Sequence, residues 1–455
     1  MRFTASYFGA LASVALSLIS AVNAEDKAVF AHYMVCGLSS VEQAQTDVRD
    51  AKALGVDAFA LNIQNVVDSW ALSAIDCLFQ AAAENDFKLL FSFDMAVLNE
   101  QDPSSFLPIF EQYAGNDTYY KHDGKPFVTT FNGGIMSNGG EWTRNLRSSI
   151  EADGFTPYFV SDFGLYSSSD SSAAESLMGS LKTYSAVDGV FSWETAWPAE
   201  QDGIVSILSS VTDKIGLDSA HATGKSYLMP LSSHQFKHID GLGNWYRRGE
   251  LTLPNRMTQI LDLEPEFVML LTWNDAGESH YIGNVWSESI STSEATQKYV
   301  DDFDHSAWQD VIAPFISAYK NGAKTAADIV PTNGNFTGAM WYRPLLKDAS
   351  CAGDYLGKPI GWENAQDTVN FAVMLPADTE EGSVKINVYS GDNLLESFDG
   401  KAGLNAQAVL GMTTGKQRVE LVNTDGTVLG AGLSAADVQA DADFCNFNYH
   451  VVHVA

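Results

Sequence analysis

The stretch EFVMLLTWNDAGESHYIG, residues 266–283, joins an apolar run to a group of acids, aromatic residues and a histidine. The apolar part, residues 266–273, has the length and composition of a buried β-strand. The polar part starts where that strand would end. Parallel barrels hold their catalytic residues at this end of each strand, so the place of the stretch in the fold decides how its acids are interpreted.

Seven similar runs precede this strand, and longer segments with helical periodicity separate them. The eight candidate strands are residues 28–35, 57–63, 88–94, 126–132, 156–162, 188–194, 225–231 and 266–273. Helix-like segments follow the first two strands at residues 41–55 and 73–86, and another closes the series at residues 307–322. Alternating strands and helices indicate parallel βα units. Eight of them over roughly 300 residues predict an α/β fold, a (β/α)8 TIM barrel at residues 25–324.

The last part of the chain, residues 325–455, has a different composition. Short alternating runs are separated by Gly, Asn and Asp turns, as in TVNFAVML at residues 368–375 and SVKINVYSG at residues 383–391. This pattern predicts a C-terminal β-sandwich domain. Such a domain either covers one side of the barrel or binds carbohydrate. The structural role is favoured because its aromatic residues do not form an obvious platform.

The N-terminus has the features of a signal peptide, residues 1–24: one Arg, an apolar core over residues 8–22, and Val-Asn-Ala before a charged residue. Cleavage after Ala24 is expected. The apolar core is too short to cross a bilayer, which takes ~20 residues, and no later segment qualifies. We therefore expect a soluble, exported protein, secreted or held in a cell wall, with no membrane partner.

Charge restricts the class of partner. The 455 residues include 57 acidic and 26 basic side chains, a formal net charge of −31. This surplus of carboxylates argues against a nucleic-acid partner, because phosphate binding needs clustered Lys and Arg. A neutral partner such as a polysaccharide fits better, and the expected state is a monomer.

The four cysteines fall into two groups along the chain. Pairing Cys36 with Cys77, and Cys351 with Cys445, keeps each disulfide within one predicted domain. Export would expose them to an oxidising compartment that favours such bonds. Their spacing does not match a zinc knuckle. Two Asn-X-Thr acceptor patterns for N-glycosylation occur, at Asn116 and Asn335.

Acidic residues gather at the predicted strand ends. Asp275 and Glu278 follow the eighth strand, and Asp94 ends the third, from which it can face them across the barrel mouth. Hydrolysis of a glycosidic bond requires one protonated carboxyl group for the leaving oxygen and a second carboxylate as base or nucleophile. Asp275 and Glu278 are the natural candidates, and Asp94 could hold water or orient a partner.

Other side chains at the strand ends could bind a sugar. Aromatic rings stack on the apolar faces of sugar rings, while amides, His and Arg hydrogen-bond hydroxyl groups. The candidate substrate-binding residues are His32, Asn62, Trp193, Glu194, Trp197, Trp245, Arg247, Trp273, Asn274, His280 and Tyr281.

Each of these residues also has a simpler structural interpretation. The acids could belong to an exposed loop or cap a helix, and the tryptophans could pack in the core. A metal-dependent hydrolase is a further alternative, with the ligands His32, His234, His238 and His280. The sequence HQFKH lacks the Glu of HExxH, and the Gly-rich run after it does not support a helix.

The chain resembles the fungal α-1,3-glucanases called mutanases, glycoside hydrolase family 71, in six blocks that occur in the same order. The blocks are FAHYMV, DAFALNI, LLFSFDM, VFSWETAWP, NWYRRGE and LTWNDAGESHYIG. The resemblance spans roughly residues 28–322, and its first and last blocks are the most specific.

The resemblance implies endo-type hydrolysis of α-1,3-glucan, with inversion at the anomeric carbon and with no metal or other cofactor. Carried over to this chain, the essential acids of the family match Asp94, Asp275 and Glu278. We expect Glu278 to act as general acid and Asp275 as general base, with Asp94 assisting. Inversion requires ~6.5 to 9.5 Å between the two carboxyl groups to admit the water, so a spacing near ~5 Å would overturn this mechanism.

The chain departs from the family in PLSSHQFKHIDGLGNWYRRGE, residues 230–250. It lacks the aromatic-rich run expected before the Asn-Trp block. This region should line the substrate groove, so the departure concerns substrate range more than chemistry. The alternatives are a barrel glycosidase of different α-glucan linkage specificity and a non-catalytic glucan-binding protein.

Overall fold

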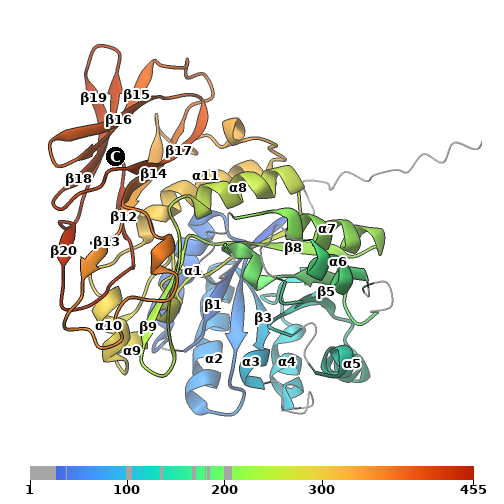
Figure 1. The fold of residues 1–455 in the computed structure, drawn as a ribbon. Coiled ribbons are helices and arrows are strands. Elements are labelled where there is room, and N and C mark those ends of the chain that lie inside the picture. The colour runs from blue at the N-terminus through green and yellow to red at the C-terminus, as the bar shows by residue number, and fades with distance from the viewer. Residues whose placement is uncertain are drawn as a thin grey trace, which may run out of the picture.

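The computed structural model describes residues 27–36, 38–98, 105–133, 137–165, 171–179, 181, 185–198 and 208–455, leaving out the side chains of residues 137–143, 173 and 177. The predicted signal peptide lies outside the described residues. Within them, strands and helices alternate in the N-terminal part of the chain, and β-sheets follow in the C-terminal part (Figure 1).

Eight parallel strands form a closed barrel, as predicted. The strands are β1 (Ala28–Met34), β2 (Ala58–Ile63), β3 (Lys88–Asp94), β5 (Lys125–Phe131), β6 (Tyr158–Asp162), β7 (Gly189–Phe191), β8 (Ser226–Leu231) and β11 (Phe267–Leu270). They follow one another around the barrel in chain order, and the barrel closes where the first strand pairs with the last, Ala31 beside Leu270. A short strand, β4 (Lys121–His122), pairs antiparallel with β5.

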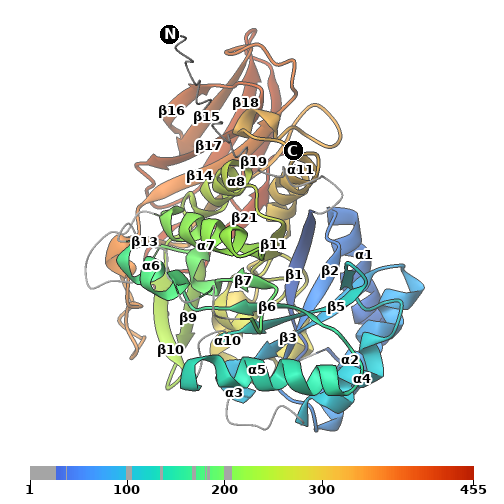
Figure 2. The same ribbon diagram turned by 90° about the vertical axis from the view of Figure 1, so that its right-hand side faces the viewer.

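Helices surround the barrel (Figure 2). The longer ones are α1 (Val41–Leu54), α2 (Ser69–Glu84), α4 (Leu107–Ala114), α5 (Ser137–Ala152), α6 (Ser172–Gly179), α7 (Val211–Ala222), α8 (Thr252–Leu263) and α11 (Gln309–Lys320). Helix α1 shows how local sequence sets the ends: Ser40 accepts a hydrogen bond from the Gln43 N–H, and Gly55 ends the helix with φ of 96°. In the described part of the chain, no helix is long and apolar enough to span a membrane.

Aromatic side chains fill the N-terminal end of the barrel interior. The Phe30 ring lies 5.2 Å from that of Phe127 and 5.8 Å from that of Phe267, between centroids. Side chains alternate along a strand, so the next residue of β1 on the same face is His32. The polar residues of the interior therefore lie toward the C-terminal ends of the strands.

The C-terminal part of the chain forms three sheets. An inner sheet contains β12 (Thr337–Tyr342), β14 (Thr368–Leu375), β17 (Gly403–Leu410) and β21 (His450–His453). An outer sheet contains β15 (Val384–Ser390), β16 (Asn393–Asp399), β18 (Gln417–Asn423) and β19 (Val428–Leu433). A small sheet pairs β13 (Leu345–Ser350) with β20 (Gln439–Asp441).

The inner sheet is buried on both faces. On one face, Met340 and Phe371 share an apolar cluster with Ile386 of the outer sheet, which gives the predicted sandwich. On the other face, Trp341 packs against Trp308 beside α11, with 6.2 Å between ring centroids. The C-terminal sheets therefore cover one side of the barrel (Figure 1). The domain boundary after residue 324 stays a prediction, because α11 packs directly on the inner sheet.

One predicted disulfide forms and the other does not. Cys351 and Cys445 are bonded, with 5.4 Å between their Cα atoms. The pairing of Cys36 with Cys77 is wrong, because both are free thiols. Cys36 follows β1 at the barrel mouth, where burial and then the nearby Asp275 charge raise the pKa of its thiol, whereas Cys77 lies on the outer helix α2. Membership of one domain does not bring two cysteines together, because their Cβ vectors must also face each other.

The chain after β11 is tied to β1. The Trp273 N–H donates a hydrogen bond to the His32 carbonyl at 2.8 Å. The Asn274 amide accepts a bond from the Met34 N–H at 2.8 Å and donates one to the Met34 carbonyl at 3.0 Å. These bonds continue the pairing of β1 and β11 beyond the strand and hold the start of the acidic loop.

Close packing of Trp273 on Gly283 gives a test of this loop. A Cβ at position 283 would lie 2.2 Å from Trp273 Cε2, well inside van der Waals contact. We expect Gly283→Ala to lower the free energy of unfolding by about 1 to 3 kcal/mol in equilibrium denaturation, because the indole or the loop must move. Gly115→Ala is the control, since nothing lies within 4 Å of its added Cβ. Equal effects of the two substitutions would contradict the packing argument.

Candidate active site

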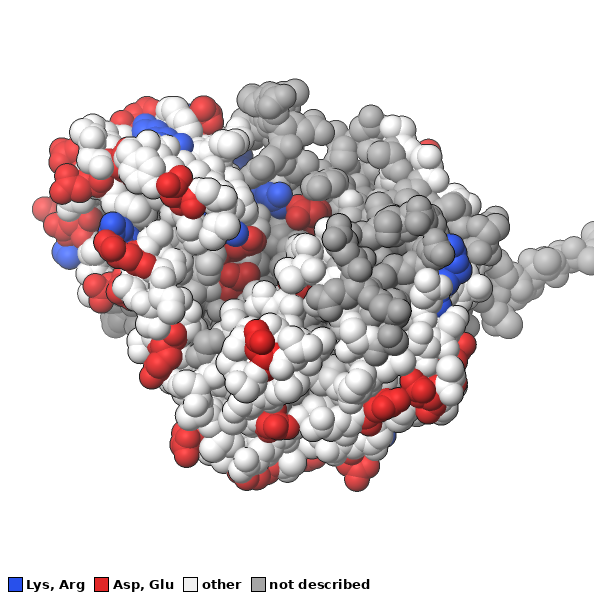
Figure 3. Space-filling view, turned by 90° about the horizontal axis from the view of Figure 1, so that it is seen from below, with Lys and Arg blue, Asp and Glu red and all other residues white. Residues whose placement is uncertain are grey.

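Three acidic side chains lie at the mouth of the barrel, where the parallel strands end. Asp94 is the last residue of β3. Asp275 precedes, and Glu278 ends, the 3-10 turn η5 (Ala276–Glu278) that follows β11. Figure 3 views the molecule from this end and shows acidic and basic side chains inside a hollow. The turn and the strand thus bring together the three acids that the sequence analysis selected.

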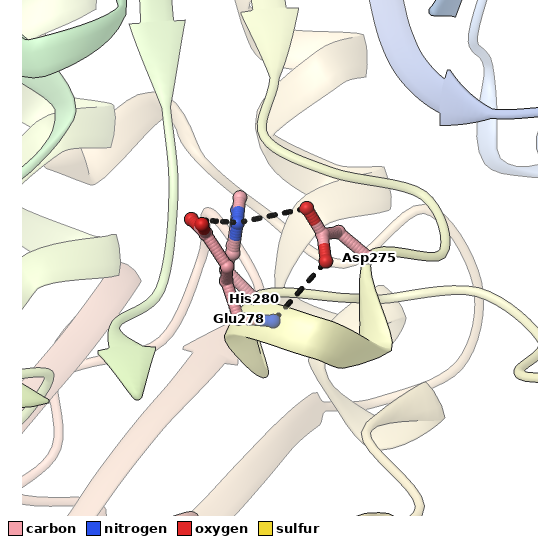
Figure 4. A group of neighbouring side chains, drawn as sticks. All are labelled: Asp275, Glu278 and His280. Carbon is pink, nitrogen blue, oxygen red and sulfur yellow. Dashed lines mark hydrogen bonds and ion pairs between the residues drawn. The ribbon is translucent and has the colours of Figure 1, made fainter. Parts of the chain in front are cut away.

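Asp275 and Glu278 converge on His280 (Figure 4). His280 Nε2 lies 3.6 Å from Asp275 Oδ2 and 3.4 Å from Glu278 Oε2. Asp275 also caps the turn, because its Oδ1 accepts a hydrogen bond from the Glu278 N–H at 3.1 Å. One oxygen of each acid and one nitrogen of His280 all lie within 4.8 Å of one another. We call these three residues the acidic cluster.

Burial and nearby charges shift the pKa values of His280 and Glu278 in opposite directions. Burial of His280 would lower its pKa, but the Asp275 and Glu278 carboxylates outweigh this effect and raise the pKa to about 9. Burial of Glu278 would raise its pKa, but His280 and Lys237 outweigh this effect and lower the pKa to about 2. Near neutral pH the imidazole is therefore protonated and Glu278 is ionised.

Strand β9 (Gln235–Ile239) supplies two further partners for Glu278. Gln235 Nε2 donates a hydrogen bond to Glu278 Oε2, and Lys237 Nζ lies 3.4 Å from Glu278 Oε1. Because side chains alternate along a strand, Gln235 and Lys237 share one face. An amide, an ammonium and an imidazole therefore surround the Glu278 carboxylate and hold it in its ionised form.

Sequence reasoning did not identify Gln235 or Lys237. The segment SHQFKHI lies in the region expected to line the substrate groove, but its sequence suggests only a histidine pair at i, i+4 spacing. It forms β9, which pairs antiparallel with β10 (Gly243–Arg247) as a hairpin. Alternation of polar and apolar residues before a Gly-containing turn predicts such a hairpin, and would have placed these two side chains on one face.

The structure does not assemble the four-histidine metal site. His234 Nε2 lies 3.1 Å from Asn448 Oδ1, and His238 Nε2 lies 2.8 Å from Asp354 Oδ2. Both rings therefore bind residues of the C-terminal part and are not available to a metal at the barrel mouth. The carboxylates of the acidic cluster already have cationic side chains as partners, and we assign no metal site to them.

Asp94 has a different environment from the acidic cluster. Its Oδ2 accepts a hydrogen bond from Asn62 Nδ2 at 3.3 Å, and its Oδ1 accepts one from the Ala96 N–H at 3.1 Å. Burial raises the pKa of Asp94 more than these bonds lower it, and the nearby Asp275 charge raises it further. The environment of Asp94 therefore favours the protonated form more than that of Glu278 does. Asn62 holds Asp94, and the predicted contact of Asn62 with substrate stays a prediction.

His32 and Trp193 are buried next to these acids. His32 Nε2 lies 3.2 Å from Ser92 Oγ, and its ring centroid lies 4.8 Å from that of Trp193. Burial lowers the pKa of His32 to about 3, so the imidazole is neutral. Trp193, the first residue of η4 (Trp193–Ala196), also packs at 6.1 Å from His280. These two side chains support the site from within the barrel.

Three aromatic residues expected to stack on sugar are buried: Trp197, Trp273 and Tyr281. Trp197 packs edge-on against His280, with 5.2 Å between ring centroids. Tyr281 stacks on His305 at 4.0 Å, on the side of the C-terminal sheets. With exposures of 0 to 2%, the three belong to the core, and the expectation that they contact a sugar is wrong for this structure.

Trp245, Arg247 and Glu194 keep exposed surface at the rim of the mouth. Lys237 Nζ lies 5.0 Å from the Trp245 ring centroid. Arg247 Nη1 lies 2.6 Å from Glu194 Oε2. These three side chains stay predicted substrate contacts, whereas the Asn274 amide is occupied by the backbone of β1.

Both predicted glycosylation sites lie on the surface. Asn116 is exposed in the turn after α4, and Asn335 is exposed in the loop before β12. A glycan needs this exposure, and the modification itself stays a prediction.

The chain matches known proteins over both its barrel and its C-terminal sheets. Residues 25–455 match the family described as Glycosyl hydrolase family 71. A Schizosaccharomyces pombe protein named glucan endo-1,3-alpha-glucosidase agn1 is 31% identical over 443 residues, which cover 95% of each chain. A mutanase of Penicillium rubens is 31% identical over 446 residues, 97% of this chain and 92% of the relative. An ascus wall endo-1,3-alpha-glucanase of S. pombe is 26% identical over 358 residues, 76% of this chain and 78% of the relative.

The acidic cluster makes stability depend on pH. The pKa of His280, about 9, lies above the ordinary value of 6.5. Its pairing with two carboxylates therefore stabilises the fold fully below about pH 6.5, and this stabilisation is lost as the pH rises toward 9. We expect the difference in unfolding free energy between the wild type and His280→Gln to shrink by roughly 2 to 3 kcal/mol from about pH 6 to pH 9.5 in denaturant titrations.

His32→Gln is the matched control for this measurement. Its pKa of about 3 keeps the His32 imidazole neutral over the whole range. His32 becomes protonated in the unfolded chain near the ordinary value of 6.5, so the difference between the wild type and His32→Gln should rise by roughly 1 kcal/mol from about pH 6 to pH 9.5, opposite in sign to the change for His280→Gln. A constant difference for His280→Gln would rule out the ion pairing described here.

Proposed function

The chain belongs to glycosyl hydrolase family 71, and from this membership we propose that it cleaves α-1,3-glucan at internal linkages, using carboxyl groups at the barrel mouth. As a member of this family it is a glycoside hydrolase. Two relatives at 31% identity carry the names glucan endo-1,3-alpha-glucosidase and mutanase, and they align over nearly the whole chain. The observation that carries the proposal is the convergence of Asp94, Asp275 and Glu278 at the C-terminal end of the barrel.

The spacing of the acids bears on which two act as a pair. Inverting hydrolysis needs carboxyl groups ~6.5 to 9.5 Å apart, so that water fits beside the anomeric carbon. One oxygen atom of Asp275 and one of Glu278 lie within 4.8 Å of each other, nearer to the ~5 Å spacing of retaining pairs than to the spacing that inversion requires. We therefore revise the expected roles and pair Glu278 with Asp94, which comes from a different strand.

Charge distinguishes the roles within the new pair. Glu278 is ionised, so it suits the general base that removes a proton from water. Burial raises the pKa of Asp94, so Asp94 suits the general acid that protonates the leaving oxygen. Asp275 holds both His280 and the turn that carries Glu278, and so orients the base. These roles replace the expected assignment of Glu278 as acid and Asp275 as base.

We also propose that the substrate lies along the rim of the mouth. The Trp245 ring has exposed surface for stacking on a sugar, and the Arg247–Glu194 pair offers donors and acceptors to hydroxyl groups. A polysaccharide without charge suits a chain with a net charge of −31, because it feels no repulsion from the surface.

We propose that the protein is exported and acts as a monomer outside the cell or in its wall. The disulfide between Cys351 and Cys445 supports this location, because such bonds persist in oxidising compartments. The signal-like residues 1–24 support it as well.

Reducing-sugar release from insoluble α-1,3-glucan tests the activity. Residues 25–455 should release sugar, and Asp94→Asn and Glu278→Gln should each lower kcat at least about a thousandfold, because each removes a group that moves a proton in the transition state. Glu84→Gln, an exposed acid on α2, is the control and should leave kcat unchanged. The first product observed by NMR should be the β-anomer, since inversion of an α-linkage gives β.

Each other outcome has a definite meaning. A well-folded wild type that releases sugar only from another α-glucan would replace the linkage in the proposal. Adsorption to the glucan without any release would make the chain a binding protein. An α-anomer as first product would exclude inversion.

An activated substrate separates the acid from the base. An aryl α-1,3-oligoglucoside with a good leaving group needs no protonation of that group. On this substrate Asp94→Asn should recover to within about tenfold of the wild type, while Glu278→Gln should stay inactive. Recovery of Glu278→Gln instead would restore Glu278 as the acid.

A further inference from the structure

The hairpin that carries Gln235 and Lys237 is held on its other face by the C-terminal part of the chain. His238 lies one position from Lys237 on β9 and therefore points to the opposite face. Its Nε2 lies 2.8 Å from Asp354 Oδ2, and its Nδ1 lies 2.7 Å from Asn244 Oδ1 on β10. The His238 and Asp354 side chains are almost fully buried, at 1% and 4% exposure. His238 thus joins both strands of the hairpin to a residue outside the barrel.

Asp354 is itself fixed by the disulfide. Its Oδ2 accepts a hydrogen bond from the Cys445 N–H at 2.9 Å, and Cys445 is bonded to Cys351, three residues before Asp354. The chain then continues along the hairpin, where the Tyr246 N–H of β10 donates to the Ile360 carbonyl at 2.8 Å. The segment from Cys351 to Ile360 therefore forms a tethered support for the hairpin.

A second contact reaches the acidic turn from the same end of the chain. Asn448 Nδ2 donates to the carbonyl of Tyr299, on α10 (Glu294–Val300), at 2.8 Å. The Tyr299 hydroxyl donates to the Gly277 carbonyl, inside η5, also at 2.8 Å. Phe236 of β9 packs edge-on against Tyr299 at 5.3 Å. Both the strand and the turn that hold Glu278 are thus braced by residues near the C-terminus.

We propose that Asp354 and Asn448, with the Cys351–Cys445 disulfide, form a clasp that positions the general base Glu278 through the β9–β10 hairpin and Tyr299. Asp354 and Asn448 are positioning residues, since neither contacts the barrel mouth directly. The C-terminal part of the chain is then a component of the active site rather than only a cover for the barrel. This inference rests on the proposed function, because it concerns the same site.

The charges around Glu278 give the clasp a measurable effect. The groups that face Glu278 are Asp275 and His280 from its own turn, Lys237 from β9 and Tyr299 from α10. A loosened hairpin moves the Lys237 ammonium away and leaves the like charge of Asp275. The pKa of Glu278 then rises, so the base loses its ionised form at a higher pH.

Asp354→Asn tests the clasp, because it keeps the shape of the side chain and removes its charge from His238. We expect the acidic limb of the kcat/KM profile on α-1,3-glucan to move up by about one pH unit. We also expect kcat to fall about tenfold because the base is displaced, and KM to rise because Trp245 and Arg247 of the rim lie on β10 of the same hairpin. Opening the tether with Cys351→Ser and Cys445→Ser together should give the same direction of change, and it leaves the Asp354 carboxylate in place.

Asp310→Asn is the matched control. Asp310 on α11 pairs with His453 of β21 at 2.7 Å, so it is also a His–Asp contact between the barrel and the C-terminal sheets, but it does not touch the hairpin. Its pH profile and kcat should equal those of the wild type. If Asp354→Asn lowers only the melting temperature and leaves both kinetic measures at wild-type values, the clasp is merely structural and the proposal is overturned.

Failure of this inference can be distinguished from failure of the proposed function. A wild type that does not hydrolyse α-1,3-glucan would refute the function, and amide hydrogen exchange over residues 235–247 would then decide the clasp alone. Exchange there should rise at least about tenfold in Asp354→Asn and not in Asp310→Asn. Unchanged exchange would show that Asp354 does not hold the hairpin.

Discussion

An ionised carboxylate that is largely removed from water needs cationic and polar partners, and the half-buried Glu278 imposes this requirement on the structure. His280 comes from the same loop, while Gln235 and Lys237 come from a hairpin that is separate in sequence. The loop must leave β11 in one direction for His280 to lie between two acids, and Asn274 fixes that direction by binding the backbone of β1. The geometry at the barrel mouth therefore depends on balancing one half-buried charge.

The barrel, the β9–β10 hairpin and the C-terminal part of the chain all contribute to the surroundings of this charge. The first strand of the barrel supports the loop, the hairpin supplies the partners, and residues beyond the barrel support the hairpin. The inner C-terminal sheet packs on α11 with one face and on the outer sheet with the other. This agrees with a family match that runs through residues 25–455 and does not end with the barrel.

The sequence predicts the barrel well because its signal is repeated and local. Eight apolar runs of strand length, each followed by a helical pattern, leave few other folds, and the strand ends share one face by geometry. Asp94, Asp275 and Glu278 could be selected on that basis.

The direction in which each side chain points could not be predicted from the sequence in the same way. Trp245 and Trp273 both lie in polar, aromatic stretches, yet Trp273 packs into Gly283 while Trp245 keeps exposed surface. Cys36 and Cys77 fail to pair for a similar reason, since distance along the chain says nothing about which way two thiols face. Long-range packing decides these cases.

The pairing of the first and last barrel strands imposes an order on folding. β1 pairs with β11, so residues near 28 must wait for residues near 267 before the barrel can close. The clasp must wait longer, because Cys445 and Asn448 lie far beyond β11 in the chain. A nascent chain that has completed its barrel therefore still lacks the brace on its hairpin, and the mature site forms only after the C-terminal sheets have been synthesised. Contacts of such long sequence separation also make folding slow, which lengthens the time that the acids spend without their partners.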